Sequence, residues 1–115
     1  MGSKPRSVGR AILTLEKIRE LNPHMPSATA LILLYVESKP GIQVRELEDL
    51  TGMTNSATSR HVLVLTERGD VARGQPGLGV VEQFPDYDDL RIKRLRLTAK
   101  GEALADSIEK INSLK

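Results

Sequence analysis

Cysteine and tryptophan are absent from this chain of 115 residues, and its aromatic residues are two tyrosines and one phenylalanine. Without a thiol, the chain forms no disulfide, no thiolate metal site and no cysteine nucleophile. The core must therefore be built from Leu, Ile, Val and Ala, which suit packed helices. The absence of cysteine also fits a reducing cytoplasm, where we expect the protein to act.

Long hydrophobic runs and catalytic constellations are missing too. No apolar stretch approaches the roughly 18 residues of a membrane span, and no secretory signal follows the N-terminus. His24 and His61 lack the spacing of a metal site. Asp86, Asp88 and Asp89 lie in one loop, with nothing to separate their pKa values. We therefore expect a single domain over 1–115 that is not an enzyme and requires no metal, cofactor or membrane.

Charge is plentiful but unevenly distributed. Charged residues make up 28% of the chain, and the net charge of +2 says little about partners. Residues 91–100 carry several bases and no acid, whereas residues 82–89 carry several acids and no base. A basic strip of this kind favours an anionic partner.

Apolar spacing and turn residues predict a mainly α chain with one small β-hairpin. Asn22-Pro23 ends the first helix, since the residue before proline avoids the helical region. Gly52 suits a tight turn, and Thr54 and Thr98 are suitable N-caps. The predicted helices are 8–22, 27–38, 44–50, 55–68 and 99–114, and the predicted strand segments are 71–73, 80–84 and 93–97.

A short helix, a glycine turn and a longer helix over 44–68 form a helix-turn-helix unit. The second helix begins with small polar residues that form helices poorly but can approach phosphates and base edges. The alternative is that these residues cap the helix and face solvent. We interpret His61 as a hydrogen-bonded core residue. The predicted DNA-binding residues of this helix are Thr54, Asn55, Ser56, Thr58, Ser59 and Arg60.

A hairpin over 70–97 follows, and it is predicted to bring basic side chains beside that helix. Leu95 and Leu97 are expected to face the core, so that Arg94 and Arg96 face outward. Basic residues on such a hairpin can meet phosphate or a minor groove. The alternative is an ordinary solvated strand face. The predicted DNA-binding residues here are Arg73, Arg91, Lys93 and Arg94.

Two apolar stripes, on the helices at 8–22 and 99–114, are too extensive for one small core to cover. A two-fold pairing of these helices in a homodimer would bury both stripes. The alternative is that the two helices pack on each other within one chain. The predicted dimer-interface residues are Val8, Ile12, Leu15, Ile18, Leu104, Ile108 and Ile111.

Several motifs over 27–105 resemble the MarR family of bacterial and archaeal winged helix-turn-helix regulators. They include Leu50-Thr51-Gly52-Met53, Ser59-Arg60-His61-Val62 and Leu65-Thr66-Glu67-Arg68-Gly69. The most specific is Asp89-Leu90-Arg91 followed by Arg94-Leu95-Arg96-Leu97-Thr98-Ala99-Lys100-Gly101. The resemblance implies that Arg91 contacts DNA, that Asp89 positions the wing, and that the terminal helices dimerise.

That resemblance implies a transcriptional regulator that acts as a homodimer on a pseudo-palindromic site in double-stranded DNA. It also allows a small-molecule effector, although no residue pattern marks a pocket for one. The chain departs from the family pattern in its longer wing with an acidic tip, in Glu48, and in Leu63 and Val64, which we expect to be exposed. The acidic tip motivates the alternative function, a winged-helix module that contacts another protein.

Overall fold

The computed structural model describes residues 4–113, and it confirms a mainly α chain with a small antiparallel sheet. The predicted end of the last helix at Leu114 lies outside the described residues. The helices are α1 (Lys4–Leu21), α2 (Ser27–Ser38), α3 (Val44–Thr51), α4 (Asn55–Leu65) and α5 (Ala99–Asn112). The strands are β1 (Ile42–Gln43), β2 (Val81–Pro85) and β3 (Lys93–Leu97), and a short 3₁₀ turn, η1, covers Val71–Arg73.

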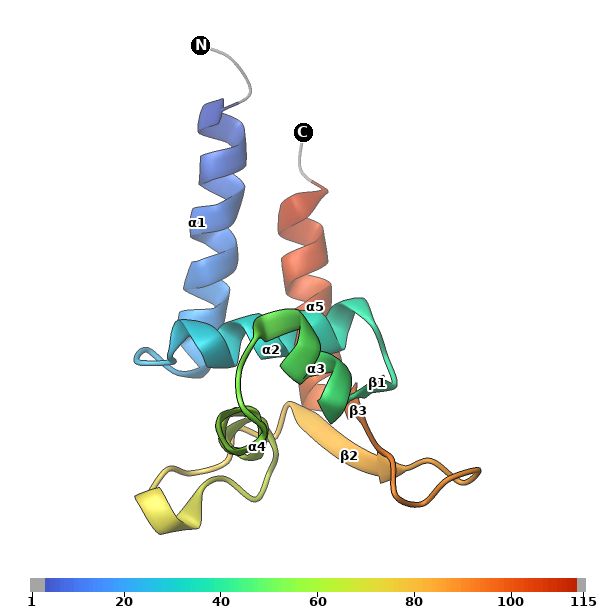
Figure 1. The fold of residues 1–115 in the computed structure, drawn as a ribbon. Helices are drawn as coiled ribbons and strands as arrows, with labels where there is room; N and C mark the ends of the chain where they lie inside the picture. The colour runs from blue at the N-terminus through green and yellow to red at the C-terminus, as the bar shows by residue number, and fades with distance from the viewer. Residues whose placement is uncertain (1–3, 114–115) are drawn as a thin grey trace.

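Helices α1 and α5 project side by side from the rest of the molecule and run in opposite directions (Figure 1). Helix α2 crosses at their base, and α3, α4 and the sheet lie on its far side (Figure 1). The loop between β2 and β3 extends on one side of α4, whereas η1 lies on the other (Figure 1). None of the helices within residues 4–113 combines the length and the hydrophobicity that a membrane span requires.

The main core joins the helix-turn-helix to the sheet, and aliphatic side chains fill it. Ile32 of α2, Leu47 of α3, Leu65 of α4 and Leu95 of β3 are all fully buried there. At about 25 cal/mol for each Å² of apolar surface removed from water, burial of this kind fixes α4 against the rest of the fold. Leu50, which follows Leu47 by three residues on α3, is 54% exposed.

A second, smaller core lies where the terminal helices meet α2. It consists of Ile18 of α1, Ala30 of α2 and Ile108 of α5. Ile18 and Ile108 were predicted to lie in a dimer interface, but both are buried within their own chain. The alternative, that the terminal helices pack on each other in one chain, therefore holds for the faces of α1 and α5 that carry Ile18 and Ile108.

The sheet has the strand order β1-β3-β2, and both pairings are antiparallel. Strand β1, only two residues long, was not predicted; it pairs Ile42 with Leu95 and Gln43 with Arg94. Strand β2 begins and ends one residue later than predicted, and pairs Val81 with Leu97. The sheet thereby joins the hairpin to the residues that lead into α3.

The wing was predicted to be longer than the family pattern. The extra length lies in the segment 66–79, between α4 and β2. Helix α4 ends at Leu65, not at residue 68, and the expected strand at 71–73 is the 3₁₀ turn η1. Gly69 and Gly77 cross so closely that a Cβ atom on Gly69 would lie 2.4 Å from the backbone nitrogen of Gly77. The β-hairpin itself is therefore only Val81–Leu97.

Candidate nucleic-acid interface

The first turn of α4 presents small polar side chains to solvent. Thr54 has an extended backbone with φ −67° and ψ 162°, and its side-chain oxygen accepts a hydrogen bond from the backbone N–H of Ala57. This N-cap satisfies a donor that the helix itself leaves unpaired. Thr54, Asn55, Ser56 and Arg60 are exposed, and Ser59 is half-buried. Most of the predicted recognition residues are therefore accessible.

Thr58 is the exception, and its prediction as a DNA-binding residue is wrong. Its side chain is fully buried, and its hydroxyl donates to the backbone oxygen of Thr54 at 2.8 Å. It lies on the inner face of α4, one turn before Val62, where no duplex can reach it.

His61 is hydrogen-bonded inside the chain. Its Nδ1 lies 2.8 Å from the hydroxyl of Thr29, a buried residue of α2. Partial burial lowers the pKa of His61, and the nearby positive charge of Arg60 lowers it further. The surroundings therefore favour the neutral ring, and its hydrogen bond to Thr29 joins α4 to α2.

Helix α3 contributes a second wall of polar residues. A capping box at its start joins the Gln43 side chain and backbone to Glu46, whose Oε1 accepts from the Gln43 backbone N–H at 3.1 Å. The helix ends at Gly52, whose φ of 73° requires the left-handed conformation that glycine adopts most readily. Between these ends, Glu48 Oε2 accepts a hydrogen bond of 2.9 Å from Asn55 Nδ2 of α4.

A surface groove lies between α3, α4 and the hairpin, and we call it the α3–α4–hairpin groove. It brings together four predicted DNA-binding residues with Asp89. Three lining residues were not among the predicted site residues, namely Gln43, Arg45 and Glu48. Arg45 and Lys93 have no ion-pair partner within the described residues. The polar residues that line the groove are Gln43, Arg45, Glu48, Asn55, Ser59, Gln83, Asp89, Arg91 and Lys93.

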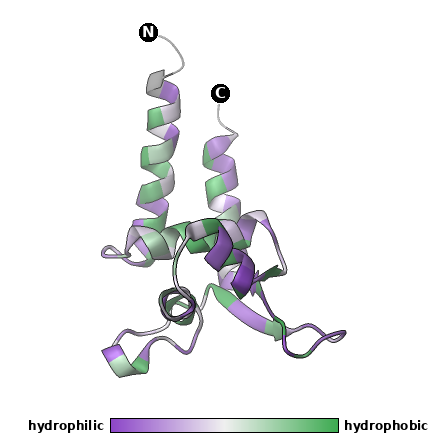
Figure 2. Cartoon of the chain, viewed as in Figure 1, coloured by the Kyte–Doolittle hydropathy of each residue, from purple (hydrophilic) through white to green (hydrophobic). Residues whose placement is uncertain are grey.

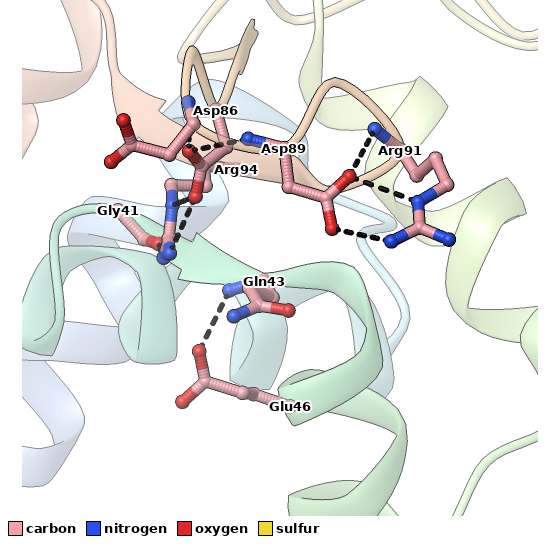
Figure 3. A network of polar contacts seen from close by, with 8 residues as sticks. Gly41, Gln43, Glu46, Asp86, Asp89, Arg91 and Arg94 are labelled. Atoms are coloured by element: carbon pink, nitrogen blue, oxygen red, sulfur yellow. Dashed lines mark hydrogen bonds and ion pairs between the residues drawn. The ribbon is translucent and has the colours of Figure 1, made fainter.

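Arg94 differs from its prediction, because its side chain is used inside the protein. Its Nε donates to Asp86 Oδ2 at 3.0 Å, and its Nη1 donates to the backbone oxygen of Gly41 at 2.9 Å (Figure 3). Asp86 Oδ1 also accepts from the backbone N–H of Asp88. These bonds, that from Asp88 first and that from Arg94 next, hold the pKa of Asp86 below its ordinary value. Arg94 thus joins the hairpin loop to the turn before β1 by hydrogen bonds.

Asp89 and Arg91 form the second polar contact of the hairpin loop. The guanidinium donates from Nε and Nη2 to the two carboxylate oxygens, each at 3.0 Å (Figure 3). This pairing holds the pKa of Asp89 below its ordinary value and raises that of Arg91. The Arg91 side chain is 90% exposed, so its guanidinium is oriented while remaining open to solvent.

Arg73 does not lie beside the other predicted basic residues. It belongs to η1, on the opposite side of α4 from the hairpin loop (Figure 1). Its Nε lies 3.4 Å from Asp70 Oδ2, and the Asp70 side chain is only 9% exposed. A strand at 71–73 would have placed Arg73 on the hairpin. The chain instead turns at Gly74, where φ is 67°, and Arg73 stays on η1.

The outer part of α1 carries apolar side chains that nothing in the described chain covers. Val8, Ile12 and Leu15 are each more than half exposed, at 53%, 55% and 56%. Hydrophobic residues recur between hydrophilic ones along the projecting length of this helix (Figure 2). On α5, Leu104 and Ile111 are half-buried. An exposed stripe of this kind is typical of a surface that another molecule covers.

Residues 25–77 match the model of the family described as MarR family. A transcriptional regulator from Thermotoga maritima is similar in structure, with a TM-score of 0.70 and 20% identity over 93% of this chain and 67% of its own. A MarR transcriptional regulator from Methanosarcina mazei Go1 gives 0.65 and 25%, over 96% and 70%. S. aureus MepR in a DNA complex gives 0.66 and 15%, over 94% and 79%. No curated protein matches the chain in sequence.

The helix-turn-helix of α3 and α4, followed by the β2–β3 hairpin, defines a winged helix-turn-helix protein. Within this class, the chain is similar to the MarR family: residues 25–77 match the family model, and the fold is shared with a MarR transcriptional regulator, which confirms the predicted resemblance.

Proposed function

We propose that this protein is a regulator of transcription that binds double-stranded DNA in the α3–α4–hairpin groove, as a binding protein and not an enzyme. The observation that carries the proposal is the grouping of Asn55 and Ser59 with Arg45, Arg91 and Lys93 around one groove. Amide and hydroxyl groups read base edges, and cations that face solvent bind phosphate. The DNA complex of S. aureus MepR, which shares the fold, supports the proposal.

In this proposal α4 enters the major groove with its N-terminal turn foremost. Asn55 and Arg60 are exposed and long enough to reach base edges, where Asn pairs with adenine and Arg with guanine. Arg91 and Lys93 then lie beside the DNA backbone and bind phosphate. The ion pair with Asp89 fixes the direction of the Arg91 guanidinium before DNA arrives.

The active form is proposed to be a homodimer in the cytoplasm. The exposed side chains Val8, Ile12 and Leu15 on α1 would pack against a second copy, with Leu104 and Ile111 beside them. Ile18 and Ile108, which are buried in the monomer, would hold the two terminal helices in position. Two recognition helices related by a two-fold axis, about 34 Å apart, would read a pseudo-palindromic site.

Selection of bound duplexes from a random pool, together with the mass of the complex, tests this proposal. The expected result is an enriched sequence with two inverted half-sites about 10 base pairs apart, bound by two chains. A pool that shows no enrichment after repeated selection would contradict sequence-specific binding. An enriched site without symmetry, bound by one chain, would contradict the dimer.

The alternative is that the hairpin loop contacts another protein, and its exposed apolar residues favour this reading. Tyr87 is 85% exposed and Leu90 is 73% exposed. The acidic residues offer less support than the sequence suggested, because Asp86 and Asp89 are paired with Arg94 and Arg91. Substitution of Tyr87 and Leu90 by serine is expected to leave duplex affinity within about twofold if the loop serves protein contact alone, since exposed positions tolerate such changes.

A further inference from the structure

We propose that Glu48 determines sequence specificity, by accepting a hydrogen bond from the exocyclic amine of a cytosine in the major groove. This inference rests on the proposed DNA-binding function and assigns a base preference to one residue of the same groove. Glu48 is one of the residues at which the chain departs from the pattern of the MarR family.

The position of Glu48 places its carboxylate on the face that would meet DNA. It lies on α3, is half-buried, and lines the groove with Asn55 and Ser59 of the recognition helix. Its Oε2 accepts from Asn55 Nδ2 at 2.9 Å. This bond fixes the Asn55 amide, and the other carboxylate oxygen of Glu48 accepts no hydrogen bond from residues 4–113.

Electrostatics explain why such a carboxylate needs a particular base. Among residues 4–113, two carboxylates line the α3–α4–hairpin groove, those of Glu48 and Asp89. Asp89 is neutralised by its ion pair with Arg91, whereas the only partner of Glu48 among residues 4–113 is the neutral amide of Asn55. A negative charge beside phosphates weakens binding to every duplex equally. A hydrogen-bond donor on a base edge offsets that penalty only in duplexes that carry the base at this position. The resulting difference in affinity between those duplexes and all others is specificity.

Major-groove chemistry selects cytosine. The donors in that groove are the exocyclic amines of cytosine and adenine. In adenine, the N7 lone pair lies beside the amine and would face the second oxygen of the carboxylate. Cytosine carries a C–H group at that place, so a carboxylate meets no acceptor there. Glutamine would reverse the preference, since its amide offers both the donor and the acceptor that adenine requires.

The test compares duplexes selected from one random pool by the parent chain and by the variants Glu48→Ala and Glu48→Gln. The parent is expected to enrich a cytosine at one position in each half-site. Glu48→Ala is expected to lose that preference by about tenfold or more, and to bind unrelated duplex more tightly. Glu48→Gln is expected to prefer adenine at the same position.

Asp49→Asn is the matched control. It removes one negative charge from the adjacent, exposed residue of α3, which does not line the groove. It is expected to leave every base preference unchanged. If Glu48→Ala and Glu48→Gln select the same bases as the parent with the same discrimination, the inference is wrong while DNA binding stands. If the parent selects no sequence, the proposed function itself fails.

Discussion

Arg91 and Arg94 are three residues apart on the hairpin, and each pairs with an aspartate. The Arg94 side chain is 31% exposed and also donates to the backbone oxygen of Gly41, so it serves the fold. The Arg91 side chain is 90% exposed and lines the α3–α4–hairpin groove, so it remains available to an anion. Two arginines of one basic strip therefore have different roles, and the exposure of their side chains distinguishes them.

Arg60→Ala and Arg91→Ala are expected to weaken DNA binding in different ways. If Arg60 reads a base edge, its loss costs about 1–3 kcal/mol on the selected site and little on other sequences. Loss of Arg91, as a phosphate contact, is expected to weaken all duplexes evenly and to make the salt dependence shallower. Titration of each variant against the selected site and a scrambled duplex measures both effects. Parent-like binding by both variants would contradict the assignment.

Two helical glycines differ in the space around them, and this predicts opposite effects of alanine. A Cβ on Gly101 of α5 would lie 2.1 Å from the backbone oxygen of Val80, whereas a Cβ on Gly9 of α1 meets nothing within 4 Å. Gly101→Ala is expected to destabilise the fold by about 1–3 kcal/mol, because the helix must move off the sheet. Gly9→Ala is expected to stabilise it by about 0.5–1 kcal/mol. Denaturant unfolding of both variants tests this; equal effects would contradict the packing of α5.

At the scale of elements, the Arg94 side chain links the hairpin loop to the rest of the fold. Arg94→Ala removes the bonds from Arg94 to Asp86 and to the Gly41 backbone, which join the hairpin loop to the turn before β1. We expect a loss of about 1 kcal/mol in stability, in line with partly exposed charge-assisted bonds. Hydrogen exchange at the backbone amides of Asp88 and Asp89 is expected to accelerate. Unchanged exchange there would show that the loop does not depend on Arg94.

The junction of α2 and α5 carries an acidic cluster that predicts a pH effect. Burial raises the pKa of Glu37, and the nearby Glu109 carboxylate raises it further. Since the folded pKa lies above the ordinary value of 4.5, ionised Glu37 destabilises the fold above that folded pKa, and the penalty disappears as the pH falls below 4.5.

Glu37→Gln is therefore expected to raise the Tm at pH 7 and to have no advantage at pH 4. Glu67→Gln, at an exposed residue outside this cluster, is the control and is expected to leave the Tm nearly unchanged at both pH values. A Glu37→Gln advantage that is the same at pH 4 and pH 7 would contradict the explanation by ionisation.

The helix-turn-helix was predictable because apolar spacing, Gly52 and the Thr54 cap all indicate the same local structure. The segment 66–79 was not, because its course depends on the close crossing of Gly69 and Gly77, residues that no local pattern connects. The burial of Thr58 was missed because small polar residues surround it in the sequence, and only the packing of α4 shows which one faces inward.

The partners of hairpin side chains depend on strand register and loop geometry. Arg94 reaches Asp86 because of the way the loop folds back, and spacing along the chain does not reveal this. Arg45 and Glu48 were left out of the predicted site because they belong to the first helix of the motif, whereas DNA-binding residues were expected on the second helix and the hairpin. The sequence feature that could have identified them is the presence of these charged residues on so short a helix of the motif.

At the scale of the whole molecule, dimerisation and DNA binding are expected to be linked. Leu15→Glu places a charge in the exposed apolar stripe of α1 and is expected to yield monomers that bind the selected site at least about tenfold more weakly, since one half-site is lost. Val71→Glu is the control, because Val71 is 79% exposed on η1, away from α1. Sedimentation and titration measure both variants. A dimeric Leu15→Glu protein would show that this stripe is not the interface.

The salt dependence of duplex binding tests the central claim most directly. With Arg45, Arg91 and Lys93 of two chains against the DNA backbone, six phosphates are contacted, and log Kd is expected to rise linearly with log salt with a slope of about 5. Binding of any duplex in low salt with such a slope is the predicted result. No measurable binding at low salt, or a slope near zero, would contradict a DNA-binding groove and favour the protein-contact alternative.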